Sequence, residues 1–552
     1  MTQKILPLLF VLIAAFFLYT YKLSFIPNGL YVDEAVTGYN AYSILKTGSD
    51  EYGKSYPFAF RFFGSYSPPL YTYLSISFIY FLDLNIFSIR ISSALLGVLS
   101  VGLIYIFLKN LDLIKNKKVI PLICVVLFMI TPWNFFYSRI GYEIYLGAFL
   151  FFLSTLLIYL GFKKRIFLTL GIIVLSLSTY GAHTEIYLAP LFFIFLLIFF
   201  WKDIIKGRRY LIWGVVLGSV IQIPHLLILN TQAFINKNSL FYINDILIHT
   251  ADLQKILPYP IALLLSFLRE FLARFMTYFS PYSLFFSPDS DPQRSLPGLS
   301  VFYFWMVVPY LIGFYFLLKK IFTQNGKYIF LLAVLSATAP ALTGDPFSTQ
   351  RALPLLFPLF LICCLGIDYI YQKFNRNIFL VFCVFLFIIS LVLLWRSYFV
   401  LFSSERAKVW GYGNQQLSNF ITSNPSESFL IDQSRLKPLY IILAFYQQID
   451  PKIIQFAADT RVRQDYYNNS SFNDEYQFKN INIKRLNFYE DIYKEVILIG
   501  DEFSISKDQA EEHFLTPVLE IKDPVGSIIF RGFKTNPLKK CQATNNYSPY
   551  CK

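Results

Sequence analysis

An adjacent pair of acidic residues, Asp33 and Glu34, stands in an apolar string that follows the first hydrophobic run of the sequence. Ionisable residues at the edge of a membrane are costly unless they serve a purpose. A carboxylate in this position can take the proton of a hydroxyl group or oppose a nearby cation. An acidic pair in a loop is as often merely solvated, so the pair indicates chemistry only if cations gather near it.

Cationic or titratable residues occur in four other short segments between apolar runs. They are Arg90, Arg139, His183 and Arg351. Each one alone could be an interfacial anchor that reaches toward lipid headgroups. Together with the acidic pair they predict a pocket for an anionic lipid headgroup, because the forked guanidinium group matches phosphate. Glu143, close to Arg139 in the chain, is expected to support this pocket or to contact a second substrate there, the acceptor.

Two further patterns have a simpler interpretation. Asp289, Ser290 and Asp291 match the metal-binding D-x-D pattern of nucleotide-sugar transferases, but three residues match often by chance, and we interpret them as a turn. Cys541 and Cys551 lie in the polar C-terminal tail and could form a disulfide if that tail is outside the cytoplasm. The sequence therefore predicts no metal ligands.

The composition places these residues in a membrane protein. Of the 552 residues, 56% are hydrophobic and only 15% are charged, which excludes an ordinary soluble enzyme. The formal net charge is +14, but the basic residues lie in short loops between apolar runs. Such loops set the orientation in the bilayer, so the charge does not indicate nucleic acid.

Apolar runs and basic loops together predict the threading of the chain. Six basic clusters must all be cytoplasmic, and about eleven crossings achieve this. The predicted crossings lie near residues 5–21, 87–108, 119–133, 144–162, 166–182, 184–201, 211–229, 301–318, 328–342, 352–372 and 378–400. Segments near 69–82 and 259–279 are then helices that do not cross, the second because its charges suit an interfacial helix.

This threading predicts an α-helical polytopic membrane protein with two parts. Residues 1–400 form a transmembrane catalytic domain with outer loops 22–86 and 230–300, and residues 401–552 form an extracytoplasmic α/β domain. In the second part we expect strands at 429–431 and 496–499, a helix at 438–446, and a hairpin over 519–533 that turns at 524–526.

Several ordered strings resemble those of a known family. They occupy residues 33–35, 38–42, 48–53, 68–71, 90–95, 131–133, 138–139, 278–281 and 350–353. In these strings the chain resembles bacterial and archaeal relatives of the dolichyl-phosphate-mannose protein mannosyltransferases and the lipid A aminoarabinose transferases. The resemblance implies the GT-C fold, a plasma-membrane location, and a polyprenyl-phosphate sugar donor used on the outer face.

The resemblance also implies roles for individual residues. Asp33 would be the catalytic base, with Glu34 beside it as a support or an acceptor contact. A single displacement that inverts the sugar is the simplest mechanism consistent with one catalytic carboxylate. Many relatives carry a charged residue just before the Pro pair, where this chain has Tyr66 and Ser67, so a divalent metal is left open. Tyr66 is expected to contact the acceptor or to support the site. The phosphate would rely on Arg139, Arg351 or His183, with Arg90 next.

The acceptor and two other classes of function stay open at this point. The enzyme would be mannosyltransferase-like, and the acceptor could be a protein, a glycan or a glycolipid. A lipid or glycan transporter or flippase is the alternative, although such proteins place polar residues near the bilayer midplane, often within repeats. A third possibility is a scaffold whose outer domain binds a partner. Release of polyprenyl phosphate from a labelled donor would distinguish the enzyme from both.

Overall fold

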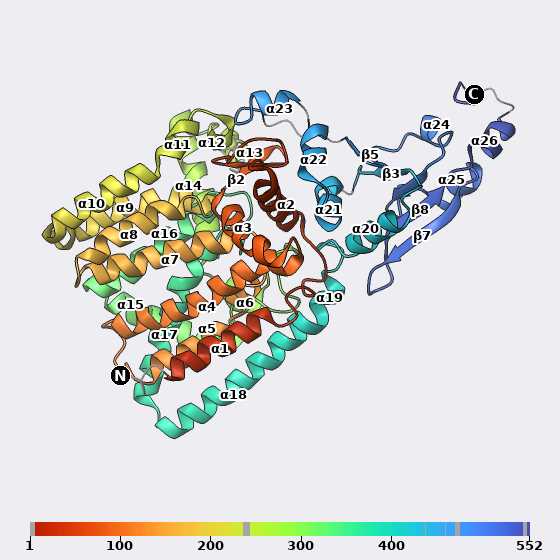
Figure 1. Ribbon diagram of the computed structural model, residues 1–552. Helices are drawn as coiled ribbons and strands as arrows, with labels where there is room; N and C mark the ends of the chain where they lie inside the picture. The colour runs from red at the N-terminus through yellow and green to blue at the C-terminus, as the bar shows by residue number, and fades with distance from the viewer. Residues whose placement is uncertain are drawn as a thin grey trace. The chain divides into compact units, whose positions relative to one another are not determined.

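The computed structural model describes residues 6–235, 243–435, 438–458, 460–469, 475–544 and 549–551, and Figure 1 traces the chain. The chain forms two compact units. The first comprises Met1–Tyr21, Ser67–Tyr71 and Ile91–Val400, and the second comprises Lys22–Tyr66, Thr72–Arg90 and Leu401–Lys552. Most of the predicted first outer loop therefore groups with the C-terminal part of the chain.

The first unit is helical, as expected of a chain that must satisfy its backbone polar groups within a bilayer. Its helices are α1 (Leu6–Thr20), α4 (Ile86–Asn110, whose first residues belong to the second unit), α5 (Ile120–Ile130), α6 (Pro132–Tyr137), α7 (Ile144–Gly161), α8 (Ile166–Ser178), α9 (His183–Ile204), α10 (Arg208–Ile221), α11 (Ile223–Ile228), α12 (Gln232–Ile235), α13 (Ile243–Leu253), α14 (Tyr259–Thr277), α15 (Val307–Lys319), α16 (Gln324–Ala341), α17 (Leu356–Lys373) and α18 (Arg376–Leu394). Short 3-10 or π segments occupy Ile205–Gly207, Tyr282–Phe286, Phe304–Met306, Leu353–Leu355 and Trp395–Leu401.

Small residues allow close packing between helices of the first unit. Helix α7 packs on α8, α8 on α10, and α15 on α17. At the α15–α17 contact, a Cβ on Gly313 would lie 1.9 Å from the carbonyl oxygen of Ile362, and one on Gly366 would lie 1.9 Å from that of Pro309. Only glycine permits this backbone approach, which is a usual device between membrane helices.

Five stretches of the described residues are long and apolar enough to cross a membrane. They are Ile86–Asn110, Ile144–Gly161, His183–Ile221, Leu353–Lys373 and Arg376–Glu405. Shorter apolar helices occur at Leu6–Thr20, Leu70–Leu82, Ile120–Ile130, Ile166–Ser178 and Phe304–Lys319. The chain is a multi-pass membrane protein, and the number of eleven crossings stays a prediction.

The second unit contains the remaining elements. They are α2 (Val32–Thr47), β1 (Phe60–Phe62), β2 (Ser65–Ser67), α3 (Leu70–Leu82), α19 (Phe402–Glu405), α20 (Asn414–Ser423), β3 (Phe429–Asp432), α21 (Leu439–Tyr446), α22 (Pro451–Ala457), α23 (Thr460–Gln464), β4 (Tyr476–Phe478), β5 (Ile481–Lys484), α24 (Phe488–Asp491), β6 (Ile497–Gly500), α25 (Lys507–Glu512), β7 (Thr516–Lys522), β8 (Ile528–Lys534) and α26 (Pro537–Ala543). Residues 67 and 70–71 at the margins of β2 and α3 are counted with the first unit.

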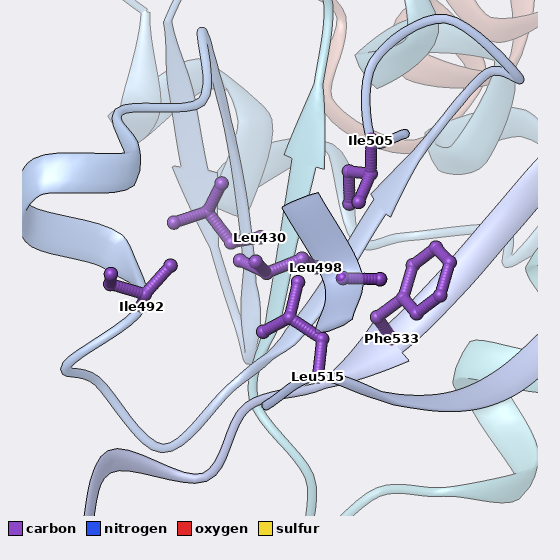
Figure 2. Packing of buried hydrophobic residues seen from close by; sticks show 7 residues of the cluster. Leu430, Ile492, Leu498, Ile505, Leu515 and Phe533 are labelled. Carbon is purple, nitrogen blue, oxygen red and sulfur yellow. The ribbon is translucent and has the colours of Figure 1, made fainter. Parts of the chain in front are cut away.

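A mixed sheet with the order β4-β5-β3-β6-β8-β7 organises the C-terminal part. Strand β3 pairs in parallel with β5 and β6, and the outer pairings are antiparallel. All four residues of β3 and of β6 are buried, as is typical of central strands covered on both faces. Figure 2 shows one face of this core, where Leu430, Leu498 and Phe533 meet Ile492 and Leu515.

The predicted elements of the C-terminal part are confirmed. The expected strands are β3 and β6, the expected helix is α21, and the expected hairpin is β7–β8. The turn of the hairpin is closed by the side chain of Asp523, which accepts hydrogen bonds from the N–H groups of Val525 and Ser527. Cys541 and Cys551 form the disulfide that the sequence suggested.

Candidate functional site

Helix α2 carries the predicted acidic pair in its first turn. The chain enters the helix from an extended Tyr31, and the helix ends at Gly48, whose φ of 71° suits a left-handed C-cap. Asp33 and Glu34 lie at the helix N-terminus, where the helix dipole stabilises negative charge. Asp33 is half-buried, whereas Glu34 is completely buried. The two neighbours therefore have different environments.

Glu34 forms a buried ion pair with Arg90. The Nε and Nη2 atoms of Arg90 donate to the two carboxylate oxygens of Glu34, each over 2.7 Å. The remaining donors bind backbone carbonyl oxygens of Leu23, Pro27 and Gly29, over 2.7 to 3.0 Å. Both side chains have an exposed fraction of 0%. The pair thus holds the loop before α2 to the start of α4.

These contacts use the hydrogen-bond donors of Arg90. A guanidinium group has five N–H donors. The two bonds to Glu34 and the three to carbonyl oxygens account for all five. Arg90 therefore has no donor left for a lipid phosphate while the loop keeps this conformation. In this conformation Arg90 and Glu34 hold the loop, and the roles expected of both in the reaction stay predictions.

Arg139, the second expected phosphate ligand, is also engaged by the protein. It is fully buried in the first unit. Its guanidinium donates to the carbonyl oxygens of Leu18, Tyr19 and Tyr21 and to the hydroxyl of Tyr398. It also lies 4.9 Å from the ring centroid of Tyr398. Four of its five donors bind the end of α1 and its neighbours, which favours a structural role.

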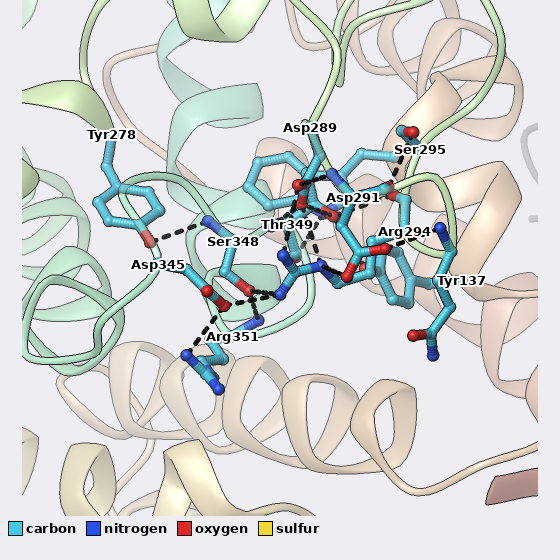
Figure 3. A network of polar contacts seen from close by, with 12 residues as sticks. Tyr137, Tyr278, Asp289, Asp291, Arg294, Ser295, Asp345, Ser348, Thr349 and Arg351 are labelled. Atoms are coloured by element: carbon cyan, nitrogen blue, oxygen red, sulfur yellow. Dashed lines mark hydrogen bonds and ion pairs between the residues drawn. The ribbon is translucent and has the colours of Figure 1, made fainter. Parts of the chain in front are cut away.

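Arg351 differs from both, because its side chain is 29% exposed. The structure gives its guanidinium one protein partner among the described residues, an oxygen of Asp345 at 3.1 Å. That oxygen also accepts from Arg294, at 2.9 Å. Figure 3 shows both arginines at the same carboxylate. Of the three expected arginines, Arg351 has most of its donors available. All five donors of Arg90 and four of the five donors of Arg139 bind protein oxygens.

The partner of Arg351 is a carboxylate that two arginines share. Burial raises the pKa of Asp345, but the hydrogen bond from Arg294 and the charge of Arg351 outweigh burial and lower the pKa below its ordinary value. Ser348 adds a hydroxyl that accepts from Arg294 over 2.8 Å. This cluster can hold Arg351 in place while its outer donors bind an anion.

The predicted turn at residues 289–291 is confirmed and has a second role. The side chain of Asp289 accepts from the N–H of Asp291 over 3.0 Å, as in an Asx turn. Asp289 is also buried and accepts from the N–H and the hydroxyl of Thr349. Both carboxylates lie within ion-pair distance of Arg294. Sequence reasoning missed Arg294, although two nearby acidic residues, Asp289 and Asp291, were a signal for a cation.

His183 and Glu143 lie at the starts of two helices of the first unit. His183 is the first residue of α9 and is half-buried, and Glu143 directly precedes α7. Thr184, the neighbour of His183, donates to the carbonyl oxygen of Arg351 over 3.3 Å. This bond brings the α9 N-terminus to the Arg351 segment, so His183 keeps its place beside the expected phosphate ligand as a prediction.

Tyr66 lies in the second unit and supports the loop rather than facing solvent. It is buried, and its hydroxyl donates to the carbonyl oxygens of Tyr466 and Asn469, at 2.6 and 3.2 Å. These bonds join the first outer loop to the C-terminal part within one unit. Tyr66 thus holds the loop, and its expected role at the site stays a prediction.

A buried acidic pair, Asp50 and Glu51, joins the same two segments and was not singled out from the sequence. Tyr466 donates to Asp50, and Tyr440 donates to Glu51 over 2.7 Å. Asn40 of α2 also donates to Glu51, over 3.0 Å. Burial raises the pKa of Asp50 to about 6 and that of Glu51 to about 7, although these hydrogen bonds act in the opposite direction.

Possible metal ligands do not cluster in the described part of the chain. No group of three or more His, Cys, Asp or Glu side chains there could hold a metal ion. Asp289, Asp291 and Asp345 are near one another, but each is within ion-pair distance of Arg294. Whether the protein uses a divalent metal therefore stays open, as in the sequence analysis.

Comparisons with known proteins find similarity only in structure. No family model matches the sequence, and no curated protein matches it. The crystal structure of ArnT from Cupriavidus metallidurans matches in the apo state, with 11% identity and a TM-score of 0.52. Its form bound to undecaprenyl phosphate matches with 12% identity and a TM-score of 0.53. Each match covers 95% of this chain and 97% of the other.

An archaeal oligosaccharyltransferase matches as well. AglB from Archaeoglobus fulgidus, in complex with an inhibitory peptide and a dolichol-phosphate, has 12% identity and a TM-score of 0.51. That match covers 95% of this chain and 74% of AglB. ArnT and AglB are GT-C glycosyltransferases, so the chain shares the GT-C fold, and the fold expected from the sequence is confirmed.

Proposed function

We propose that this protein is a membrane glycosyltransferase that moves a sugar from a polyprenyl-phosphate donor to an acceptor hydroxyl outside the cytoplasm. The observation that carries the proposal is the GT-C fold over 95% of the chain. Two structures with this fold hold polyprenyl phosphates, undecaprenyl phosphate in one and a dolichol-phosphate in the other. The first-loop motif that begins at Asp33 supports the same function.

In the proposed reaction the acceptor oxygen attacks the anomeric carbon of the donor sugar. The bond between that carbon and the phosphate oxygen breaks, and the polyprenyl phosphate leaves with the bonding electrons. Asp33 takes the proton of the acceptor hydroxyl, so charge and atoms balance. One displacement of this kind inverts the anomeric centre. A mannosyl donor is the sugar that we propose.

The two ends of this reaction need different protein groups. A base must be ionised and reachable, and half-buried Asp33 at a helix N-terminus suits that task better than buried Glu34. The leaving phosphate needs donors that the protein does not already use, and Arg351 has them. We therefore propose Asp33 as the base and Arg351 as the main phosphate ligand, with His183 assisting it.

The test is turnover of a labelled polyprenyl-phosphate sugar by purified protein in lipid nanodiscs. Asp33→Asn keeps the shape of the side chain and removes its basicity, so turnover should fall by about 10² to 10⁴-fold. Donor binding should be unchanged in this variant. Asp508→Asn is the matched control, because Asp508 is an exposed carboxylate in the first turn of another helix, α25.

Arg351→Lys tests the other end of the reaction. It should weaken binding of the donor phosphate, because one ammonium replaces the forked donors. Turnover at the wild-type rate in both Asp33→Asn and Arg351→Lys would refute the assignment of roles. Failure of the wild-type protein to release polyprenyl phosphate from any such donor would refute the function itself.

A further inference from the structure

A cavity of about 400 Å³ lies within the second unit, between the loop before α2 and the segment that begins α20. Its volume falls in the range of small-molecule sites, roughly 300 to 1,000 Å³. The cavity is lined by Ser24, Phe25, Asn28, Gly29, Ile86, Gly411, Tyr412, Gly413, Gln415, Gln416, Asn419 and Tyr446. Of these residues, only Gly29 also belongs to a site described above, through its carbonyl oxygen, which accepts from Arg90.

The lining mixes polar and apolar residues and carries no charged side chain. It contains four side-chain amides, of Asn28, Gln415, Gln416 and Asn419, together with one serine and two tyrosine hydroxyls. An amide both donates and accepts hydrogen bonds, and so does a sugar hydroxyl, which makes the two chemically complementary. An arginine or lysine would favour a phosphate or carboxylate ligand, and the lining offers neither.

Asn28 has an unused hydrogen-bonding atom in this cavity. Its Nδ2 donates to the carbonyl oxygen of Ser403. Its Oδ1 is buried, and no described residue donates to it. A buried acceptor without a donor destabilises the folded state unless something else supplies the hydrogen bond. A ligand hydroxyl that enters the cavity would supply it.

Both walls of the cavity are held in place before any ligand arrives. The loop wall is fixed by Arg90, whose guanidinium binds the carbonyl oxygens of Leu23, Pro27 and Gly29. The opposite wall turns at Gly411 and Gly413, with φ of 73° and 90°. A Cβ on Gly411 would lie 2.7 Å from the carbonyl oxygen of Leu30, so this wall needs glycine. A preformed site spends less of its binding energy on ordering.

The cavity adjoins the ion pair beside the proposed base. Tyr446 lines the cavity, and the charges of both Arg90 and Glu34 act on its phenol. Glu34 is the neighbour of Asp33 in α2. A ligand that contacts Tyr446 in the cavity would therefore lie within reach of the charges of the Glu34–Arg90 pair.

We propose that this cavity binds a neutral saccharide. The inference rests on the proposed function, in which the two saccharides are the donor sugar and a glycan acceptor, and both would offer the same hydroxyl chemistry. A saccharide suits a cavity with several amides better than an extended peptide does, because a peptide strand needs a row of unpaired backbone groups.

The experiment is a direct binding measurement by saturation-transfer NMR on full-length protein in nanodiscs, which keeps maltoside detergents out. The probes are mannobiose, chitobiose and maltose, with glucuronic acid as a charged control and a Ser/Thr-rich peptide as the alternative ligand. The variants are Gln416→Ala and Asn419→Trp, both at exposed positions of α20 that should not disturb folding. Gln542→Ala, at an exposed position of α26, is the matched control.

At least one neutral disaccharide should bind saturably and more tightly than glucuronic acid. Gln416→Ala should weaken that binding by about fivefold, the effect of one net hydrogen bond, and Asn419→Trp should abolish it by filling the cavity. Gln542→Ala should bind like the wild type. No saccharide binding, equal binding in the α20 variants, or preference for the charged sugar or the peptide would overturn the proposal.

Two further arms separate this inference from the proposed function and identify the source of the saccharide. Elongation of the bound disaccharide by one sugar marks it as the acceptor, whereas competition with the lipid-linked donor marks the cavity as the donor-sugar site. Saccharide binding without any turnover of the donor would leave this site standing and refute the transferase. Turnover without saccharide binding would refute this site alone.

Discussion

The buried pair of Glu34 and Arg90 allows a test of whether Arg90 is structural. Glu34→Gln leaves the guanidinium without a counter-charge in a site where both side chains are 0% exposed. Removal of one partner from such a pair typically costs 3 to 5 kcal/mol, roughly the whole margin of a small domain. Arg90→Lys should cost a similar amount, because an ammonium group cannot make the five bonds of the guanidinium.

The assay is thermal unfolding in nanodiscs, followed by intrinsic fluorescence, with donor binding measured well below the unfolding midpoint. Both variants should lower the midpoint clearly, and donor affinity should change by no more than about twofold. Asp112→Asn is the matched control, since Asp112 pairs with Lys163 and both side chains are 58% exposed. An exposed pair of this kind contributes about 0 to 1 kcal/mol, so this midpoint should hardly move.

A double substitution completes the test. Glu34→Gln combined with Arg90→Met removes both charges, so its cost should be smaller than the sum of the two single costs. The reasoning fails if Arg90→Lys keeps the wild-type midpoint and loses affinity for the donor phosphate. That result would make Arg90 a phosphate ligand and would mean that its five protein contacts are replaced when the donor binds.

Three other outcomes are expected. Stability should fall as pH rises from about 4.5 to about 7, because folded Glu51 and, up to about pH 6, folded Asp50 hold their protons more tightly than the unfolded chain does; Glu51→Gln should make this fall smaller, and an unchanged profile contradicts the raised pKa of Glu51. A cysteine at exposed Ser426 should react with an impermeant maleimide on intact cells and one at exposed Lys164 only after permeabilisation; the reverse pattern would invert the predicted topology. Unfolded protein should show four free thiols before reduction and six after it, whereas six before reduction would exclude the disulfide between Cys541 and Cys551.

The amino-acid sequence alone predicts the parts of this protein that depend on local pattern. Apolar runs identify a membrane protein, because a spanning segment must be long and continuous in hydrophobicity. Short buried strands and the turn at residues 524–526 predict the C-terminal sheet, since strand and turn preferences act over a few residues. The first-loop strings indicate the GT-C fold, which the structural similarity to ArnT confirms.

The partners of the three expected arginines were decided only by the tertiary structure. Arg90, Arg139 and Arg351 are equivalent as sequence letters, and all three were expected to bind phosphate. Carbonyl oxygens bind three donors of Arg90 and three of Arg139, whereas Arg351 faces one carboxylate. Every residue carries a carbonyl group, so such acceptors leave no trace in the sequence. Which arginine has donors to spare therefore depends on where the folded backbone passes.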